Sequence, residues 1–158
     1  MWSRSRIDKA TSRYQPVDST VARTLTGISE AYDNMSKHKE AAQSFLKMAG
    51  TGKVQEAYDQ YVASSFIHHN QYFKGDRQSL LTSMQEASRT SPNKSIDVKH
   101  VYEDGDTVIT HSLVSRQDPE APDIVVVHIF RFEQDRIVEL WDVGQPVSKD
   151  SPNAHGMV

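Results

Sequence analysis

The stretch DIVVVHIFRFEQDRIVELWDVGQPV, residues 123–147, decides the fold because it predicts two β-strands joined by a tight turn. A two-residue turn would set charged side chains opposite hydrocarbon at two positions. A three-residue turn at 134–136 with a bulge matches charge with charge and hydrocarbon with hydrocarbon, and we predict this register. It pairs Arg131 with Glu139, Phe130 with Leu140, Phe132 with Val138 and His128 with Asp142. An acid and an imidazole then lie side by side on an otherwise apolar face.

The remainder of the chain predicts helices first and strands afterwards. Apolar residues recur at helical spacing in three segments, which we expect to begin at caps formed by Ser36, Thr51 and Asp76. The chain alternates like a strand from residue 96 onward, and Asp104-Gly105 predicts a hairpin. Three helices followed by at least four antiparallel strands indicate an α+β domain.

Further histidines are expected on the same apolar face as His128. A two-residue turn in the first hairpin places His100 and His111 diagonally on that face. If Arg116 pairs with Asp123 across the next loop, His111 falls opposite His128. Together with Asp142 these histidines could form a facial metal site. No recognised ligand spacing such as His-Glu-x-x-His occurs, however, so we predict no metal and no other cofactor.

Composition excludes several classes of protein. The chain has 158 residues, enough for one domain with a core or a lined cavity. Its formal charge of −3 argues against nucleic acid as the partner, and the lack of cysteine excludes disulfides and thiolate chemistry. No apolar run is long enough to span a membrane, and the N-terminal residues lack the apolar stretch of a secretory signal. We therefore expect a cytoplasmic protein without membrane or nucleic-acid partners.

The stretch VVHIFRFEQDRIVELWDV, residues 126–143, resembles the SnoaL-like branch of the nuclear transport factor 2-like superfamily. The order of elements over residues 37–147 is similar too, as are His69-Asn70, Gly75 and the Gln-Pro-Val after the last strand. The resemblance implies a cone, in which a strongly bent antiparallel sheet wraps around N-terminal helices and encloses a ligand pocket. Residues 1–36 have no counterpart and are expected to form an extension, partly helical or disordered, while residues 148–158 form a tail.

The resemblance also implies roles for particular residues. In the polyketide cyclase that names the group, an aspartate near the end of the last strand is the acid/base catalyst, and a histidine on the preceding strand lies in the same pocket. Those positions fall on Asp142 and His128, the pair that the strand register brought together independently. Histidine is common in a bacterial subgroup at the positions of His111 and His69. The substrate-binding residues are expected to be His111, His69, Asn70, His100 and Phe130.

Two functions fit these residues. The first is a SnoaL-like enzyme whose Asp142 and His128 catalyse cofactor-independent aldol-type cyclisation, isomerisation or dehydration of a carbonyl compound in an apolar pocket. The alternative is a non-catalytic module that uses the same pocket to bind a small apolar ligand or to dimerise, with the histidine and aspartate forming only a core hydrogen bond. We also expect a homodimer through the outer sheet face, which carries much hydrocarbon: Val127, Ile129, Trp141 and Val143.

Overall fold

The structure is a computed structural model that describes the backbone of residues 19–158, together with the side chains of residues 23, 24, 28 and 37–158. The first half of the expected N-terminal extension, residues 1–18, therefore lies outside the described residues. The chain divides into two compact units, one ending at Tyr32 and the other running from Asp33 to Val158. The second unit holds the sheet and the candidate site.

Three helices precede most of the sheet: α1 (Ser19–Gly50), α2 (Val54–Tyr61) and α3 (Arg77–Thr90). The expected starts at Ser36 and Thr51 are wrong. Ser36 lies inside α1, where neither glycine nor proline interrupts the helix between residues 28 and 49, and the Thr51 hydroxyl donates to the Lys47 carbonyl at 2.7 Å at the C-terminal end of that helix. The cap of α3 is confirmed, since the Asp76 side chain accepts a hydrogen bond from the Ser79 backbone N–H at 2.9 Å.

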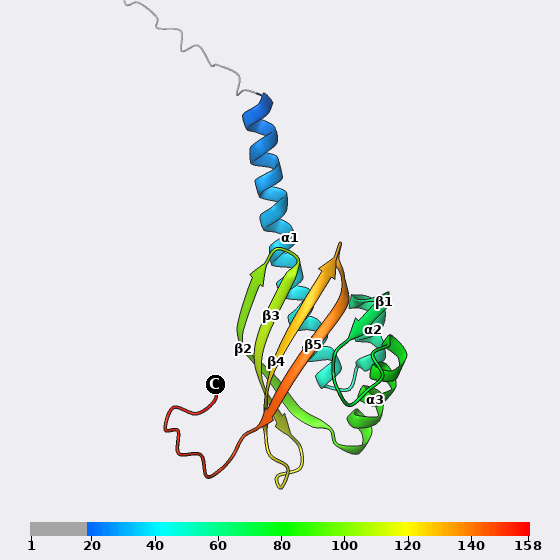
Figure 1. The fold of residues 1–158 in the computed structure, drawn as a ribbon, viewed down its shortest axis with the longest axis vertical. Coiled ribbons are helices and arrows are strands. Elements are labelled where there is room, and N and C mark those ends of the chain that lie inside the picture. Colours follow the sequence, from blue (N-terminus) through cyan, green and yellow to red (C-terminus); the bar gives the residue numbers. More distant parts are fainter. Residues whose placement is uncertain (1–18) are drawn as a thin grey trace, which may run out of the picture. The chain divides into compact units, whose positions relative to one another are not determined.

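Five strands form one sheet in the order β1-β5-β4-β3-β2. Their bounds are β1 (Val62–His68), β2 (Asn93–Asp104), β3 (Thr107–Arg116), β4 (Ile124–Glu133) and β5 (Arg136–Pro146). Strands β2 to β5 pair antiparallel, whereas β1 pairs in parallel with β5. The α+β class is confirmed, with a mixed sheet. Figure 1 shows β2 to β5 side by side, with α2, α3 and β1 gathered on the β5 side of the sheet.

The register of the last hairpin is confirmed where it matters for the site. His128 pairs with Asp142, Phe130 with Leu140 and Arg131 with Glu139. The end of the hairpin differs from the prediction, because Phe132 pairs with Ile137 rather than with Val138 and a bulge follows Arg131. Glu133 pairs with Arg136, so the turn has two residues, and Gln134 takes the left-handed conformation with φ of 56°.

The register expected for the first hairpin is wrong. Asp104 pairs with Thr107, so the turn residues are Gly105 and Asp106, and Gly105 supplies a φ of 60°. This shift of two residues sets His100 directly opposite His111 and leaves the two on one face. The next pairing is the one that turns β3 over, because it lies one residue away from the predicted register. In the next pairing, His128 is opposite Thr110, and His111 is opposite Val127. His111 therefore lies on the sheet face opposite that of His128.

The hydrophobic core lies between the three helices and one face of the sheet, which we call the inner face. The helices contribute Ala42, Phe45, Leu46, Ala49, Val54, Ala57, Tyr58, Leu80 and Leu81. The sheet contributes Val62, Phe66, Val108, Phe130, Phe132, Ile137 and Leu140. Gly50 packs so closely against the Ile96 side chain that a Cβ would not fit, which joins the end of α1 to β2. None of the described helices is both long and apolar enough to cross a membrane.

Candidate functional site

A cavity of about 750 Å³ opens at the end of the inner face where β5 finishes. The loop after β1 forms one wall with residues 69–73, and the strands form the others. The strand residues on the wall are Arg116, Ile124, Val126, Asp142, Val143, Gly144 and Pro146. We call this space the Asp142 cavity. Its size suits a small molecule rather than a peptide or a nucleic acid.

Asp142 is held in the cavity wall by the loop after β1. The Asn70 side-chain Nδ2 donates a hydrogen bond to Asp142 Oδ2 at 2.9 Å. Asn70 is itself fixed, because its Oδ1 accepts a hydrogen bond from the Tyr72 backbone N–H at 2.9 Å. Within the described part of the chain, Asp142 Oδ1 has no hydrogen-bond partner. The carboxylate is thus oriented through one oxygen and retains the other for a ligand.

His128 lies directly across from Asp142 on the inner face, one position deeper than the cavity wall. Its ring stacks on Phe130 with centroids 5.7 Å apart, and its buried Nδ1 has no hydrogen-bond partner among the described residues. Burial lowers the pKa of His128 to about 4, while the Asp142 carboxylate acts in the opposite direction. The imidazole is therefore neutral near pH 7, so it can offer one N–H donor without adding a positive charge.

Two hydroxyl groups join His128 in a polar cluster that the sequence analysis missed. Thr110 and Ser112 are fully buried, and neither Thr110 Oγ1 nor Ser112 Oγ has a hydrogen-bond partner in the part of the chain that the structure describes. Thr110 pairs with His128, and Ser112 pairs with Val126 of the cavity wall. Buried polar atoms normally have partners, so this cluster favours water or a polar group of a ligand beside Asp142. Pairing Thr110 rather than His111 with His128 would have revealed it from the sequence.

Tyr58 on α2 is a further residue that the sequence analysis did not connect with the site. Its side chain is fully buried, and its hydroxyl lies 3.5 Å from Met84 Sδ. Burial raises the pKa of Tyr58, the nearby Arg77 guanidinium opposes this, and the Asp142 carboxylate raises the pKa further. The phenol therefore keeps its proton and is a neutral donor near the Asp142 carboxylate.

His69 lies on the wall of the Asp142 cavity, but its ring is engaged elsewhere. His69 Nε2 is 2.8 Å from Glu139 Oε1, and the ring stacks on Trp141 at 4.6 Å between centroids. Glu139 also accepts a hydrogen bond from Arg131 Nε at 2.7 Å, and these bonds from Arg131 and His69 lower the pKa of Glu139. The Arg131–Glu139 pair predicted from the strand register therefore also anchors the loop that carries Asn70.

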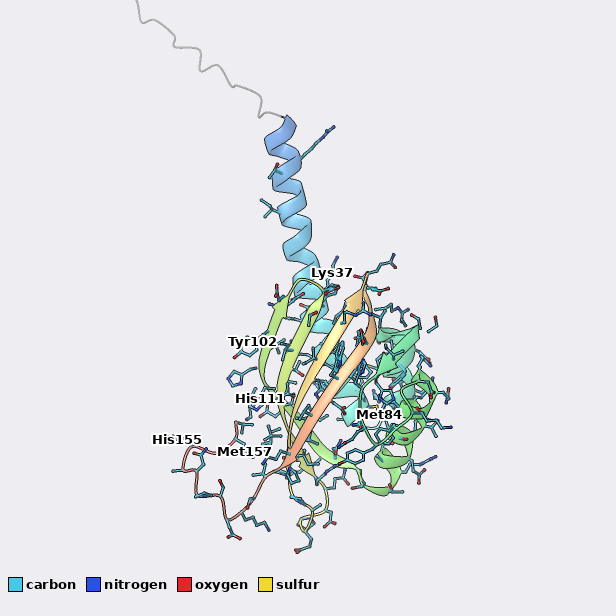
Figure 2. All side chains as sticks on the ribbon, in the orientation of Figure 1. Lys37, Met84, Tyr102, His111, His155 and Met157 are labelled. Carbon is cyan, nitrogen blue, oxygen red and sulfur yellow. The ribbon has the colours of Figure 1, made fainter. Side chains whose placement is uncertain are left out.

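The structure does not bring the other expected binding residues to Asp142. His100 and His111 lie on the outer face, with their Nδ1 atoms 3.3 Å apart, and Figure 2 shows His111 beside β2 and β3, away from Met84 and the helices. The convergence of His100, His111, His128 and Asp142 is therefore wrong. Among the described residues, no group of three or more His, Asp or Glu is arranged to hold a metal ion.

Phe130 belongs to the core rather than to the cavity wall. Its side chain is fully buried and makes an edge-to-face contact with Phe45, with ring centroids 5.9 Å apart. Phe130 is the next residue after His128 on the inner face, and its ring stacks on the histidine. The expected contact between Phe130 and a ligand is therefore not provided by this cavity.

Comparison with known proteins identifies the family. Residues 42–140, more than half of the chain, match the family described as the SnoaL-like domain. No curated protein matches the chain.

Several solved structures share the fold. An LEH-like epoxide hydrolase of Mycobacterium tuberculosis superposes with a TM-score of 0.59 at 16% identity, covering 70% of this chain and 84% of that chain. IdmH, a candidate polyketide cyclase of Streptomyces antibioticus, gives 0.58 at 16% identity, covering 68% and 91%. An NTF2-like protein of unknown function from Burkholderia xenovorans gives 0.60 at 15% identity, covering 75% and 91%. At these identities the likeness establishes the nuclear transport factor 2-like fold alone.

Proposed function

Since the chain belongs to the SnoaL-like domain family, whose fold serves several chemistries, we propose from the chain's own residues that it is an enzyme that acts on a small molecule by cofactor-independent acid/base chemistry. The observation that carries this proposal is the oriented Asp142 carboxylate, which faces a cavity of about 750 Å³ and lies opposite a buried neutral histidine. The substrate class that fits is a carbonyl compound with an acidic C–H bond, undergoing isomerisation, aldol-type cyclisation or dehydration.

Asp142 moves the proton in this proposal. Its carboxylate takes a proton from the carbon next to the carbonyl group, and the electron pair of that C–H bond forms an enolate. The protonated Asp142 then returns the proton to carbon or to a leaving oxygen. Asn70 is a positioning residue, because it binds only the carboxylate oxygen that faces the loop.

The buried polar cluster lies behind the cavity wall, where its neutral dipoles would favour the negative charge that develops on the carbonyl oxygen. Thr110, Ser112 and His128 have unpaired polar atoms on the inner face, and His128 can donate from Nδ1 in the tautomer that carries its proton there. Neutral donors suit this role, since a permanent positive charge on His128 would instead stabilise the Asp142 carboxylate and weaken it as a base.

The proposal is tested by deuterium exchange of a simple ketone. We expect the protein to accelerate the exchange of the C1 protons of 2-tetralone in D2O, measured by proton NMR against buffer alone. A Gly144→Leu variant is expected to lose this acceleration, because its side chain would fill the Asp142 cavity. Gly144→Ala is the matched control, since a Cβ at this position meets the Ile124 and Val126 side chains at 3.4 and 3.5 Å, within ordinary contact.

Exchange at the buffer rate in the wild type would contradict the enzyme proposal. If 2-tetralone then still bound and Gly144→Leu abolished that binding, the non-catalytic ligand-binding module would replace it. Undiminished exchange in a folded Gly144→Leu variant would show instead that catalysis takes place outside the Asp142 cavity.

We further propose that a second copy of the chain covers the outer sheet face. Val143 is 73% exposed and Ile109 37% exposed, and both lie on this face beside half-buried Val127, Ile129 and Trp141. We expect sedimentation at micromolar concentration to give a dimer, and Val143→Glu to shift the equilibrium towards monomer, whereas Glu56→Gln, at an exposed position on α2 and not on this face, leaves it unchanged. A wild-type monomer under these conditions would contradict the dimer.

A further inference from the structure

Arg116 gives the Asp142 cavity a positive end. Among the described residues that line this cavity, Arg116 is the only arginine or lysine. It is the last residue of β3 and follows Val114, Ser112 and Thr110 along the inner face. The proposed mechanism assigns it no role, so its purpose at the cavity wall needs a separate account.

The guanidinium of Arg116 is held by neutral acceptors and keeps free donors. Its Nη1 donates to Asn93 Oδ1 at 2.6 Å and to the Ser91 carbonyl oxygen at 3.5 Å. A guanidinium has five N–H groups, so those on Nε and Nη2 remain without a hydrogen-bond partner in the described part of the chain. These bonds fix the orientation of the group without neutralising its charge.

The neighbouring carboxylate does not take the guanidinium as its partner. Asp123 Oδ1 accepts from the Arg116 backbone N–H at 3.3 Å, and Asp123 Oδ2 accepts from the Ser115 hydroxyl at 3.2 Å. No ion pair joins the Arg116 side chain to a carboxylate anywhere in residues 37–158. A half-buried, oriented and unpaired guanidinium beside a cavity is well suited to bind a carboxylate through two parallel hydrogen bonds.

The wall between Arg116 and Asp142 is apolar. Along the inner face, Val126 pairs with Gly144, and Ile124 pairs with Pro146. Thr110 pairs with His128, which pairs with Asp142, and Arg116 lies six residues further along β3 than Thr110. Roughly 20 Å of strand therefore separates the backbone of Arg116 from the level of Asp142, before the length of the side chains is counted. A ligand that touches both must therefore be elongated, with hydrocarbon in the middle.

We propose that the substrate is an elongated keto acid, whose carboxylate binds Arg116 while its carbonyl end lies at Asp142. This inference rests on the proposed function and adds the substrate class to it. Arg116 is a binding residue in this arrangement, and the proton transfer at the other end of the ligand does not involve it.

The test compares a keto acid with its uncharged amide. Binding of 9-benzoylnonanoate, a long keto acid, and of its amide, 9-benzoylnonanamide, is measured by isothermal titration calorimetry on the wild type, Arg116→Gln and Arg116→Lys. We expect the wild type to bind the acid about tenfold or more tightly than the amide. Arg116→Gln should bind the two alike, and Arg116→Lys should keep part of the preference. Arg136→Gln is the matched control, because Arg136 lies outside the cavity and binds the Asp59 and Gln60 carbonyls.

Equal binding of acid and amide by the wild type would overturn the proposal, as would a preference that survives Arg116→Gln. Should Arg116→Gln fail to fold, the wild type alone decides: its preference for the acid must fall as salt is raised, and a preference independent of salt overturns the proposal. If the wild type exchanges 2-tetralone but binds neither benzoyl compound, the keto-acid inference fails and the proposed function stands. If it prefers the acid but exchanges nothing, the anion site stands and the catalytic proposal fails.

Discussion

Asp142→Asn is expected to slow the exchange of the 2-tetralone C1 protons by about 100- to 10,000-fold relative to the wild type, the range typical of losing a positioned general base. The asparagine side chain has nearly the same shape, and its Oδ1 can still accept the hydrogen bond that Asn70 donates to Asp142 Oδ2. The loop after β1 should therefore stay in place. The loss would then fall on the rate of proton transfer, with little effect on ketone binding.

Two further variants make this result specific. Asn70→Ala removes the group that orients the carboxylate but leaves the carboxylate itself, so we expect a smaller loss than in Asp142→Asn. Glu56→Gln removes an exposed carboxylate on α2 and should exchange at the wild-type rate. If Asp142→Asn retained the wild-type exchange rate while the ketone still bound, Asp142 would not be the base.

Acidification is expected to destabilise the protein through His128. The folded-state pKa of about 4 lies below the ordinary value of 6.5, so the unfolded chain takes up a proton on this histidine that the folded protein does not. Its contribution to the free energy of unfolding is complete above about pH 6.5 and falls as the pH drops towards 4, with a total loss of about 3 kcal/mol. Urea unfolding at a series of pH values measures this loss.

Comparing the free energy of unfolding of the wild type with that of a variant without this imidazole separates the contribution of His128 from that of other titrating groups. In His128→Gln the decline in unfolding free energy between pH 6.5 and 4 should be smaller than in the wild type by about 3 kcal/mol. His155→Gln, a change at an exposed histidine in the C-terminal tail, should keep the wild-type decline. If the unfolding free energy declined equally in the wild type and in His128→Gln, His128 would have the same pKa in the folded and unfolded chain, which contradicts the prediction.

The last hairpin could be predicted from the sequence because its register is over-determined. Arg131 and Glu139 must pair to avoid facing hydrocarbon, and this match fixes His128 opposite Asp142. The details of the turn were not fixed by the same argument. The extra residue is accommodated by a bulge after Arg131, a local backbone feature that side-chain matching does not specify.

The pairing of β3 with β4 shows why part of the site could not be predicted. The loop that joins these strands is irregular, so the sequence does not decide whether Thr110 or His111 lies opposite His128, and this difference of one residue turns β3 over. In the structure Thr110 pairs with His128, which places Thr110 and Ser112 on the inner face and His111 on the outer face. A serine or threonine in a strand gives no sign in the sequence that it is buried, because its neighbours are set by tertiary structure.

Two further residues of the site, Asn70 and Arg116, depend on contacts between segments that are far apart in the sequence. Asn70 reaches Asp142 only because β1 joins the sheet in parallel beside β5, a pairing that the sequence pattern did not reveal. Arg116 reaches the cavity because β3 ends there, and its hydrogen bonds to Ser91 and Asn93 hold it at that end. Both residues therefore become visible only when the strand order is known.

NMR titration of the His128 imidazole, in the wild type and in Asp142→Asn, tests the central claim most directly: that a buried neutral histidine and the Asp142 carboxylate form a coupled pair. We expect a midpoint near pH 4 in the wild type, set by burial. In Asp142→Asn the midpoint should move lower, because the carboxylate that favours the protonated imidazole is gone. A midpoint that is the same in both proteins would contradict the coupling, and a midpoint near the ordinary value of 6.5 in the wild type would contradict the burial.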